Sequence, residues 1–216
     1  MFRVLIAGGT GQVGSAVVRA LLACAECKEV VAVVRKSGAF ADERVRQVVM
    51  DTAATTFESD VTRLARELGD PLYAASCIGI GKGSREWSEE DMTKLEVGVV
   101  GAFARGCFAA GVERFALLSA AGSTPKSRIR YVRVMGQKEE VVKAIGFPRL
   151  SIFRPGIIAG NVNTPGYLAS LGRLIPGSFG TIDQDDIGRA FVAELTHGAL
   201  GVTLLENSAM KQRARA

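Results

Sequence analysis

The stretch VLIAGGTGQVGSAVVRALL, residues 4–22, decides the fold. It opens with an apolar run typical of a buried strand, turns through glycines, and continues with helical spacing from about Gln12. Gly8 permits a tight turn, Gly11 lets backbone approach a pyrophosphate, and Gly14 lets the helix pack closely on the strand. The pattern therefore predicts a strand–turn–helix unit whose first helical N–H groups bind a dinucleotide. An inert tight turn is the alternative.

The rest of the chain repeats this alternation of strand and helix. Such alternation predicts an α/β fold, a doubly wound parallel sheet with helices on both faces. We expect residues 1–200 to form a single domain with a short lid at 156–180, and residues 201–216 to form a C-terminal segment with a disordered basic tail. Strands are expected near 3–7, 30–34, 46–50, 72–78, 113–118, 149–154 and 179–182, and helices near 11–23, 60–68, 87–110, 127–145, 164–173 and 185–198.

Composition excludes several classes of protein. The 216 residues are 48% hydrophobic and 23% charged, and no uncharged apolar stretch is long enough to span a membrane. Cys24 and Cys27 have no second cysteine pair and His197 is the single histidine, so no metal site is expected. The strand-like run at the N-terminus leaves no room for a cleavable targeting peptide, and we expect a reduced, cytoplasmic protein. Import through an internal signal stays open.

The end of the second expected strand indicates which dinucleotide binds. Sites that prefer NAD place an acid there, but this chain has Arg35, Lys36 and Ser37, with no acid before Asp42. Two cations and a hydroxyl suit a 2′-phosphate. We therefore predict NADP(H) over NAD(H), with an exposed basic turn as the alternative. Asp51, after the third strand, either reaches the adenine edge or caps a turn.

Further landmarks stand in order along the chain. They are Cys77-Ile78-Gly79, Phe115-Ala116-Leu117-Leu118-Ser119, Tyr131, Ser151-Ile152-Phe153-Arg154-Pro155-Gly156 and Thr181-Ile182-Asp183-Gln184-Asp185-Asp186-Ile187. With the glycine turn, this set resembles the short-chain dehydrogenase/reductase family, above all its atypical short members, the NmrA-like and Tat-interacting oxidoreductase-like proteins. The resemblance implies a Rossmann fold with strand order 3-2-1-4-5-6-7 and a cofactor lying across the C-terminal strand ends.

The resemblance and the glycine turn together give a set of cofactor contacts. The region after Gly156 is short, which favours a small substrate over a nucleotide sugar. Trp87 either walls this substrate site or packs at a helix start. The expected cofactor-binding residues are Gly8, Thr10, Gly11, Gln12, Val13, Arg35, Lys36, Asp51, Cys77, Ile78, Gly79, Pro155 and Gly156.

The stretch RYVRVMGQKEEV, residues 130–141, departs from the family's catalytic pattern. In the family, a tyrosine acts as general acid/base, a serine polarises the substrate oxygen, and a lysine four residues after the tyrosine lowers its pKa. The matching residues are Tyr131 and Ser119, with Ser123 as the alternative serine, but Met135 replaces the lysine. Lys138 returns to the same helical face about 10 Å further along the axis, so direct replacement is doubtful.

Two functions follow from an intact cofactor turn beside an incomplete tyrosine–lysine dyad. The first is NADPH-dependent reduction of a small carbonyl, quinone or flavin-like substrate, with the cofactor carrying the reaction. The second is a non-catalytic dinucleotide-sensing or regulatory protein. The basic stretch from Lys126 to Lys138 is then either a partner surface or a solvated helix face. A homodimer is possible in either case. Nucleic acid is not expected, because Tyr131 is the stretch's one aromatic residue.

Overall fold

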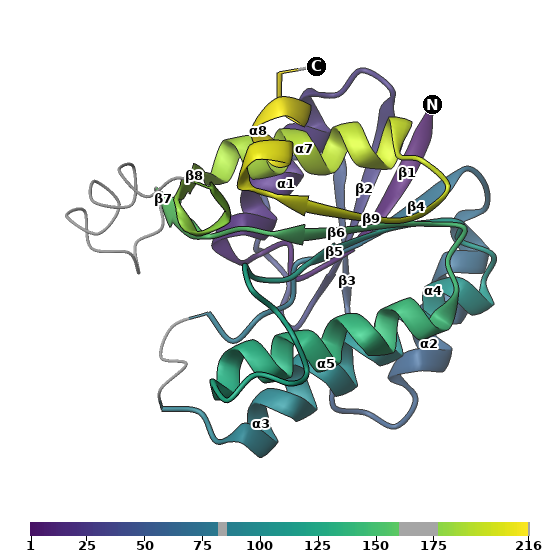
Figure 1. The fold of residues 1–216 in the computed structure, drawn as a ribbon. Coiled ribbons are helices and arrows are strands. Elements are labelled where there is room, and N and C mark those ends of the chain that lie inside the picture. Colours follow the sequence, from purple (N-terminus) through teal and green to yellow (C-terminus); the bar gives the residue numbers. More distant parts are fainter. Residues whose placement is uncertain (82–85, 160–176, 216) are drawn as a thin grey trace.

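Seven parallel strands form one central sheet in the computed structural model, which describes residues 1–81, 86–159 and 177–215 (Figure 1). The predicted doubly wound fold is confirmed, with strand order β3-β2-β1-β4-β5-β6-β9. The strands are β1 Phe2–Ala7, β2 Cys27–Val34, β3 Val45–Val49, β4 Leu72–Ser76, β5 Arg114–Leu118, β6 Arg149–Arg154 and β9 Gly201–Glu206.

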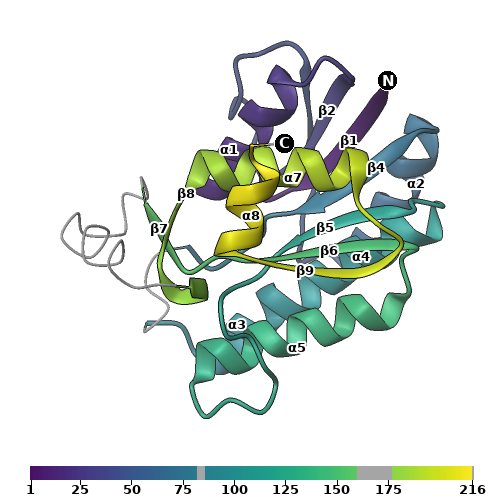
Figure 2. The same ribbon diagram turned by 45° about the horizontal axis from the view of Figure 1, so that its top comes forward.

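Helices cover both faces of the sheet, and the two views in Figures 1 and 2 agree on the layers. One face carries α1 Gln12–Ala23, α7 Gln184–His197 and α8 Asn207–Arg213. The other carries α2 Phe57–Leu68, α3 Glu89–Thr93, α4 Val100–Ala109 and α5 Arg130–Ile145. A single π-helical turn, η1 Lys94–Val99, joins α3 to α4, so the helix expected at 87–110 is divided into three pieces.

The central strands are buried on both sides because their residues alternate between two cores. In β1, Val4 and Ile6 pack toward α1 and α7, while Leu5 and Ala7 pack toward α2 and α4. The two cores explain why these strands are continuous apolar runs rather than alternating ones.

The seventh strand is the main correction to the expected fold. The strand expected near 179–182 exists as β8 Thr181–Asp183, but it pairs with β7 Ile157–Ala159 in a separate small sheet. The edge of the main sheet is completed instead by β9, which pairs with β6. Val202 and Leu204 of β9 are about half exposed, whereas Leu205, on the opposite face of the strand, is buried in the core beneath α7.

The C-terminal segment is ordered through residue 213, contrary to the expected disordered tail. Lys211 Nζ donates to the Thr181 carbonyl at 2.8 Å, and Arg213 Nε pairs with buried Glu194 at 2.7 Å. These contacts hold α8 against the body of the domain. The expected helix at 164–173 and most of the lid at 156–180 fall outside the described residues. In the part of the chain that is described, no helix has the length and apolarity to cross a bilayer.

Helices α1 and α7 approach each other closely at Gly188. A Cβ built on Gly188 would lie 2.6 Å from the Ala16 carbonyl oxygen, closer than atoms can sit. We predict that Gly188→Ala lowers the free energy of unfolding by about 1–3 kcal/mol, because the helices must separate to admit a methyl group. Urea unfolding followed by circular dichroism measures this change.

Gly98→Ala is the matched control for this prediction. Gly98 is also helical, but the nearest atom to its built Cβ is the Thr93 oxygen at 3.9 Å. Alanine there should stabilise the protein by up to about 1 kcal/mol. Equal effects of the two substitutions would contradict the close packing of α1 on α7.

Candidate dinucleotide site

A cavity of about 370 Å³ lies at the C-terminal ends of β1, β2 and β4. It brings together seven of the predicted cofactor residues, and Trp87 also lies in its wall. The lining residues are Ala7, Gly8, Thr10, Gly11, Val33, Val34, Arg35, Thr52, Cys77, Ile78, Gly79, Ile80, Trp87, Leu95 and Val99.

The glycine turn has the conformation that its sequence predicts. Gly8 has φ +78°, and its built Cβ would lie 2.4 Å from the backbone of Cys77, so the turn rests directly on the end of β4. A Cβ on Gly14 would lie 2.0 Å from the Gly8 oxygen. The turn and the first turn of α1 are therefore fixed by contacts that admit glycine alone.

The start of α1 fits a phosphate. Gly11 is its N-cap and provides no side-chain hydrogen bond, and the first turn carries no acid. A Cβ on Gly11 would meet only the Gly8 oxygen, at 3.4 Å, so the space in front of the helix is open. Gln12 Oε1 is buried and has no partner among the described residues. Uncapped N–H groups at the positive end of a helix dipole favour an anion in that space.

The basic end of β2 is free to meet a ligand. Arg35 and Lys36 are exposed, and neither forms an ion pair with a described residue. Asp42 is engaged elsewhere, because it pairs with Arg44 at 3.1 Å, and the hydrogen bonds from Arg44 lower the pKa of Asp42. The positive charge at this end of the cavity is therefore not neutralised by Asp42, the next acid along the sequence.

Several predicted contacts lie beside the cavity rather than in its wall. Asp51 Oδ1 accepts a hydrogen bond from the Ala53 N–H at 2.9 Å, as a turn cap does, and Thr52 lines the cavity in its place. Gly156 N–H donates to Asn207 Oδ1 at 3.0 Å, holding the Arg-Pro-Gly turn to α8. The residues outside the wall are Gln12, Val13, Lys36, Asp51, Pro155 and Gly156. Their contact with a cofactor stays a prediction.

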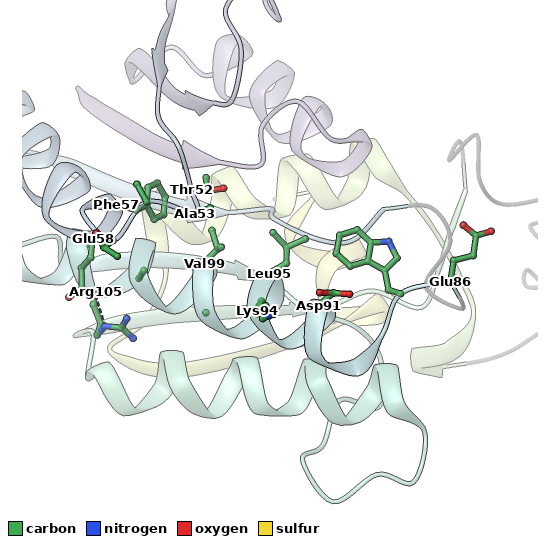
Figure 3. Close-up of a pocket in the computed structure, with 15 residues that line it drawn as sticks. Thr52, Ala53, Phe57, Glu58, Glu86, Asp91, Lys94, Leu95, Val99 and Arg105 are labelled. Atoms are coloured by element: carbon green, nitrogen blue, oxygen red, sulfur yellow. Dashed lines mark hydrogen bonds and ion pairs between the residues drawn. The ribbon is translucent and has the colours of Figure 1, made fainter.

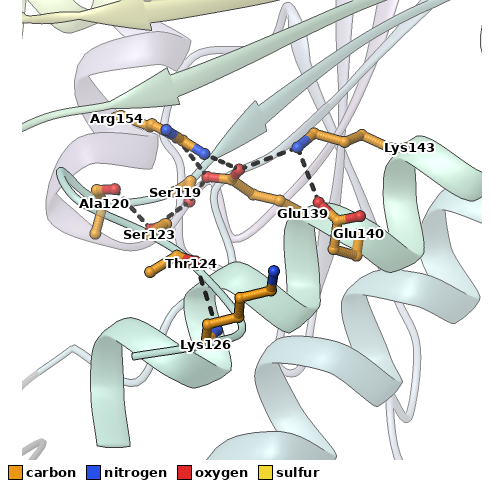
Figure 4. A network of polar contacts seen from close by, with 9 residues as sticks. All are labelled: Ser119, Ala120, Ser123, Thr124, Lys126, Glu139, Glu140, Lys143 and Arg154. Atoms are coloured by element: carbon orange, nitrogen blue, oxygen red, sulfur yellow. Dashed lines mark hydrogen bonds and ion pairs between the residues drawn. The ribbon is translucent and has the colours of Figure 1, made fainter. Parts of the chain in front are cut away.

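The two candidate serines lie in a buried polar network (Figure 4). Ser119 Oγ donates to Glu139 Oε1 at 2.6 Å, and Ser123 Oγ donates to the Ala120 carbonyl at 2.6 Å. Each hydroxyl has a single proton, so neither serine has one left to donate to a substrate oxygen in this arrangement. Arg154 holds Glu139 through two further hydrogen bonds. The geometry supports a positioning role for Ser119, and its catalytic role stays a prediction.

No cation among the described residues lowers the pKa of Tyr131. Burial raises the pKa of the phenol, and the nearby Glu96 carboxylate raises it further. Met135 is buried and carries no charge, and Lys138 Nζ pairs with Glu96 Oε2 at 2.7 Å. Tyr131 is therefore held in its protonated form. It packs among Ile80, Met92, Trp87, Leu95, Val97 and Val134.

A larger open groove of about 940 Å³ continues from the cavity (Figure 3). Four residues line both hollows, namely Thr52, Trp87, Leu95 and Val99. Trp87 thus borders both hollows, and it also packs against the cluster of Ile80, Met92 and Val134 beside the start of α3. The groove's rim carries the Glu58–Arg105 ion pair, with Arg105 Nε 2.8 Å from Glu58 Oε2. No cluster of three metal-ligating side chains occurs in residues 1–81, 86–159 and 177–215.

Sequence reasoning missed Glu96, Glu139, Thr52 and the cavity-lining face of η1. Glu96 had a detectable signal, since it is an isolated acid within the apolar run Leu95-Glu96-Val97. A buried acid in such a run needs a partner, and Lys138 is on the helix packed beside it.

Comparison with known proteins gives a consistent family. A model of NAD(P)H-binding proteins matches residues 8–198. "Protein fmp52, mitochondrial" of Aspergillus fumigatus is 31% identical over 207 residues, covering 89% of this chain and 86% of the relative. The fmp52-1 protein of Aspergillus oryzae is 32% identical over 187 residues, covering 84% and 77%.

Solved structures share the fold at low sequence identity. The Bordetella bronchiseptica enzyme WbmH, solved in complex with NAD⁺, matches with TM-score 0.72 and 19% identity over 100% of this chain and 79% of that one. The oxidoreductase ylbE of Lactococcus lactis matches with TM-score 0.67 and 16% identity, over 99% and 95%. Both support the Rossmann arrangement of the sheet.

The expected cytoplasmic location is contradicted by these relatives, whose names place them in mitochondria. The expectation rested on reduced cysteines and on the start of the sequence. Reduced thiols indicate a reducing compartment, but they do not indicate which reducing compartment it is.

We predict that Tyr131 stays protonated well above pH 10, the ordinary phenol value. The pKa of Tyr131 is higher in the folded state than in the unfolded state. The contribution of the protonated phenol to the free energy of unfolding is therefore complete below the unfolded-state pKa and is lost as the pH rises toward the folded-state pKa. In wild type, unfolding free energy should thus fall more steeply above about pH 10 than in Tyr131→Phe. Urea unfolding at several pH values measures this difference.

Near-ultraviolet absorbance of phenolate gives an independent check. The difference spectrum between wild type and Tyr131→Phe should show no phenolate signal while the protein remains folded. An ionisation near or below the ordinary value would mean that a cation does stand beside Tyr131.

Proposed function

The chain belongs to the family of NAD(P)H-binding proteins, and from that premise we propose that it is an NADPH-dependent reductase of a small carbonyl, quinone or flavin-like substrate. The observation that carries this proposal is the cavity at the strand ends, bordered by the uncapped start of α1 and by Arg35, a cation with no ion-pair partner in the described part of the chain.

Binding follows from the groups at the cavity wall. The N–H groups in the first turn of α1 would hold the pyrophosphate. Arg35 and Lys36 would hold the 2′-phosphate, which NAD(H) lacks. When bound, the dinucleotide supplies the hydride. The protein's own contribution is to orient the cofactor and to exclude water from the apolar side formed by Leu95 and Val99.

The state of Tyr131 favours reduction over oxidation. A protonated phenol donates a hydrogen bond to a substrate oxygen, whereas alcohol oxidation needs a base at the same place. Met135 supplies no charge, and burial keeps the phenol neutral. Quinone- and flavin-like substrates suit this arrangement, because hydride transfer to them depends on position more than on a strong acid.

A dinucleotide-sensing protein is the second candidate. The observation that favours it is the serine network, in which both hydroxyl protons already have acceptors. Lys126 and Arg128, exposed just before α5, would then contribute to a partner surface. For either function we propose a mitochondrial setting, in line with the names of the relatives.

We predict that the double substitution Arg35→Ala/Lys36→Ala weakens NADPH binding by about tenfold to a hundredfold. The lost charge-assisted hydrogen bonds to the 2′-phosphate are each worth roughly 1.5–3 kcal/mol, less where solvent screens them. NADH binding should change little. Calorimetric titration of both cofactors measures the two dissociation constants.

Arg46→Ala is the control, because Arg46 is an exposed cation on the neighbouring strand β3 that does not line the cavity. It should leave both cofactor affinities near wild type. Tighter binding of NADH than of NADPH by the wild-type protein would overturn the predicted preference.

Turnover distinguishes the two candidate functions. Wild type is mixed with NADPH and a panel of quinones, flavins and small carbonyls, and the loss of reduced nicotinamide absorbance is followed. Activity that survives Tyr131→Phe identifies a reductase that acts by positioning, whereas loss of at least about a hundredfold identifies Tyr131 as the acid. Tight NADPH binding without turnover across the panel would favour the sensing protein.

A further inference from the structure

A buried ion pair lies between the cavity and the helix that carries Tyr131. Glu96 is 1% exposed and Lys138 2% exposed, and Lys138 Nζ lies 2.7 Å from Glu96 Oε2. Ile80, whose N–H contacts Glu96, belongs to an apolar cluster with Met92 and Val134. Such a buried ion pair is costly to desolvate and is weak evidence for stability.

The second oxygen of Glu96 contacts the backbone that borders the cavity. Glu96 Oε1 accepts a hydrogen bond from the Ile80 N–H at 3.0 Å. A Cβ built on Gly79 would lie 3.5 Å from the same oxygen, so the carboxylate rests against the loop after β4. Gly79 and Ile80 both line the cavity, which places the carboxylate one layer behind the cavity wall.

The π-helical turn η1 explains how Glu96 reaches this position. Within η1, Leu95 and Val99 line the cavity while Glu96 points to the interior and is buried. A π turn holds an extra residue relative to an α-helix, and such turns are frequent at functional sites. The wider turn therefore presents an apolar wall to the cavity and a carboxylate to the loop behind it.

Lys138 contacts the other oxygen of Glu96, Oε2, from helix α5. Side chains of an α-helix lean toward its N-terminus, so Lys138 reaches back along α5 toward the level of Met135. Met135 is buried and brings no charge, and Lys138 thus supplies the cation of α5 that lies behind the cavity.

We propose that Glu96 and Lys138 form a positioning unit for the dinucleotide, which fixes the Gly79–Ile80 backbone at the cavity wall from behind. The inference rests on the proposed cofactor binding. The unit acts through backbone, and neither residue touches the cofactor or the substrate. In the family's pattern, a lysine at position 135 binds the cofactor directly. In this chain the ion pair instead holds the loop that borders the cavity.

The test replaces the pair by apolar residues in Glu96→Leu/Lys138→Met. Replacement of a whole buried ion pair by packed apolar side chains is often neutral or stabilising, so the fold should persist. We expect a melting temperature near or above wild type, faster amide hydrogen exchange at Ile80 in the cofactor-free protein, and an NADPH dissociation constant raised by about tenfold. A pair that serves stability alone would leave NADPH affinity unmoved.

A second variant covers the case in which the double substitution does not fold. Glu96→Gln keeps an oxygen for the Ile80 N–H but removes the charge that holds Lys138. Its matched control is Glu194→Gln, because Glu194 is also buried, at 3% exposed, and paired with a cation, but lies on α7 across the sheet. We expect weaker NADPH binding in Glu96→Gln by several-fold and unchanged binding in Glu194→Gln.

The outcomes separate this inference from the function on which it rests. Wild type that binds neither NADPH nor NADH overturns the proposed function and the positioning unit together. Wild type that binds NADPH, with variants at Glu96 that bind it equally well, overturns the positioning unit alone. Equal weakening by Glu96→Gln and Glu194→Gln also overturns it, since any buried carboxylate would then have the same effect.

Discussion

The contact between the glycine turn and the end of β4 is the constraint on which the rest of the site depends. Gly8 approaches Cys77 so closely that any side chain would overlap backbone, and Gly14 approaches Gly8 in the same way. These contacts fix the direction in which α1 leaves the sheet, and with it the direction of its first N–H groups. The cavity lies at this position because the glycine turn, the end of β4 and the start of α1 meet without side chains between them.

The parts of the fold that are determined locally could be predicted from the sequence. The spacing of Gly8, Gly11 and Gly14 and the continuous apolar runs of β1 and β2 carry their own physical meaning, so the turn and the parallel sheet followed from them. The seventh strand could not be predicted in the same way. Residues 181–183 and 201–206 are both short and contain β-branched residues, and only tertiary packing decides which run pairs with β6.

The polar interior escaped prediction for a related reason. A sequence shows that Glu96, Glu139, Lys138 and Arg154 are charged, but their helical or strand positions do not say which partner each one meets. Glu139 accepts one hydrogen bond from Ser119 and two from Arg154, and the first of these changes what the serine can do. The residue types at the candidate site could be predicted. The hydrogen bonds that each side chain makes could not, because they depend on neighbours far apart in the chain.

The presence of Met135 in place of the family's lysine therefore changes less than the loss of a whole catalytic pair would. A lysine beside the tyrosine does two things, since it lowers the phenol pKa and it grips the cofactor. In this chain the first effect is reversed, because burial and Glu96 raise the pKa of Tyr131. A buried cation is still present one layer away, where Lys138 is bound to Glu96 and Glu96 to the Ile80 backbone. The two roles of the lysine, lowering the pKa of the tyrosine and positioning the cofactor, can thus be separated within one fold. Such a site can support a reaction that depends on the position of the cofactor and substrate more than on a strong acid.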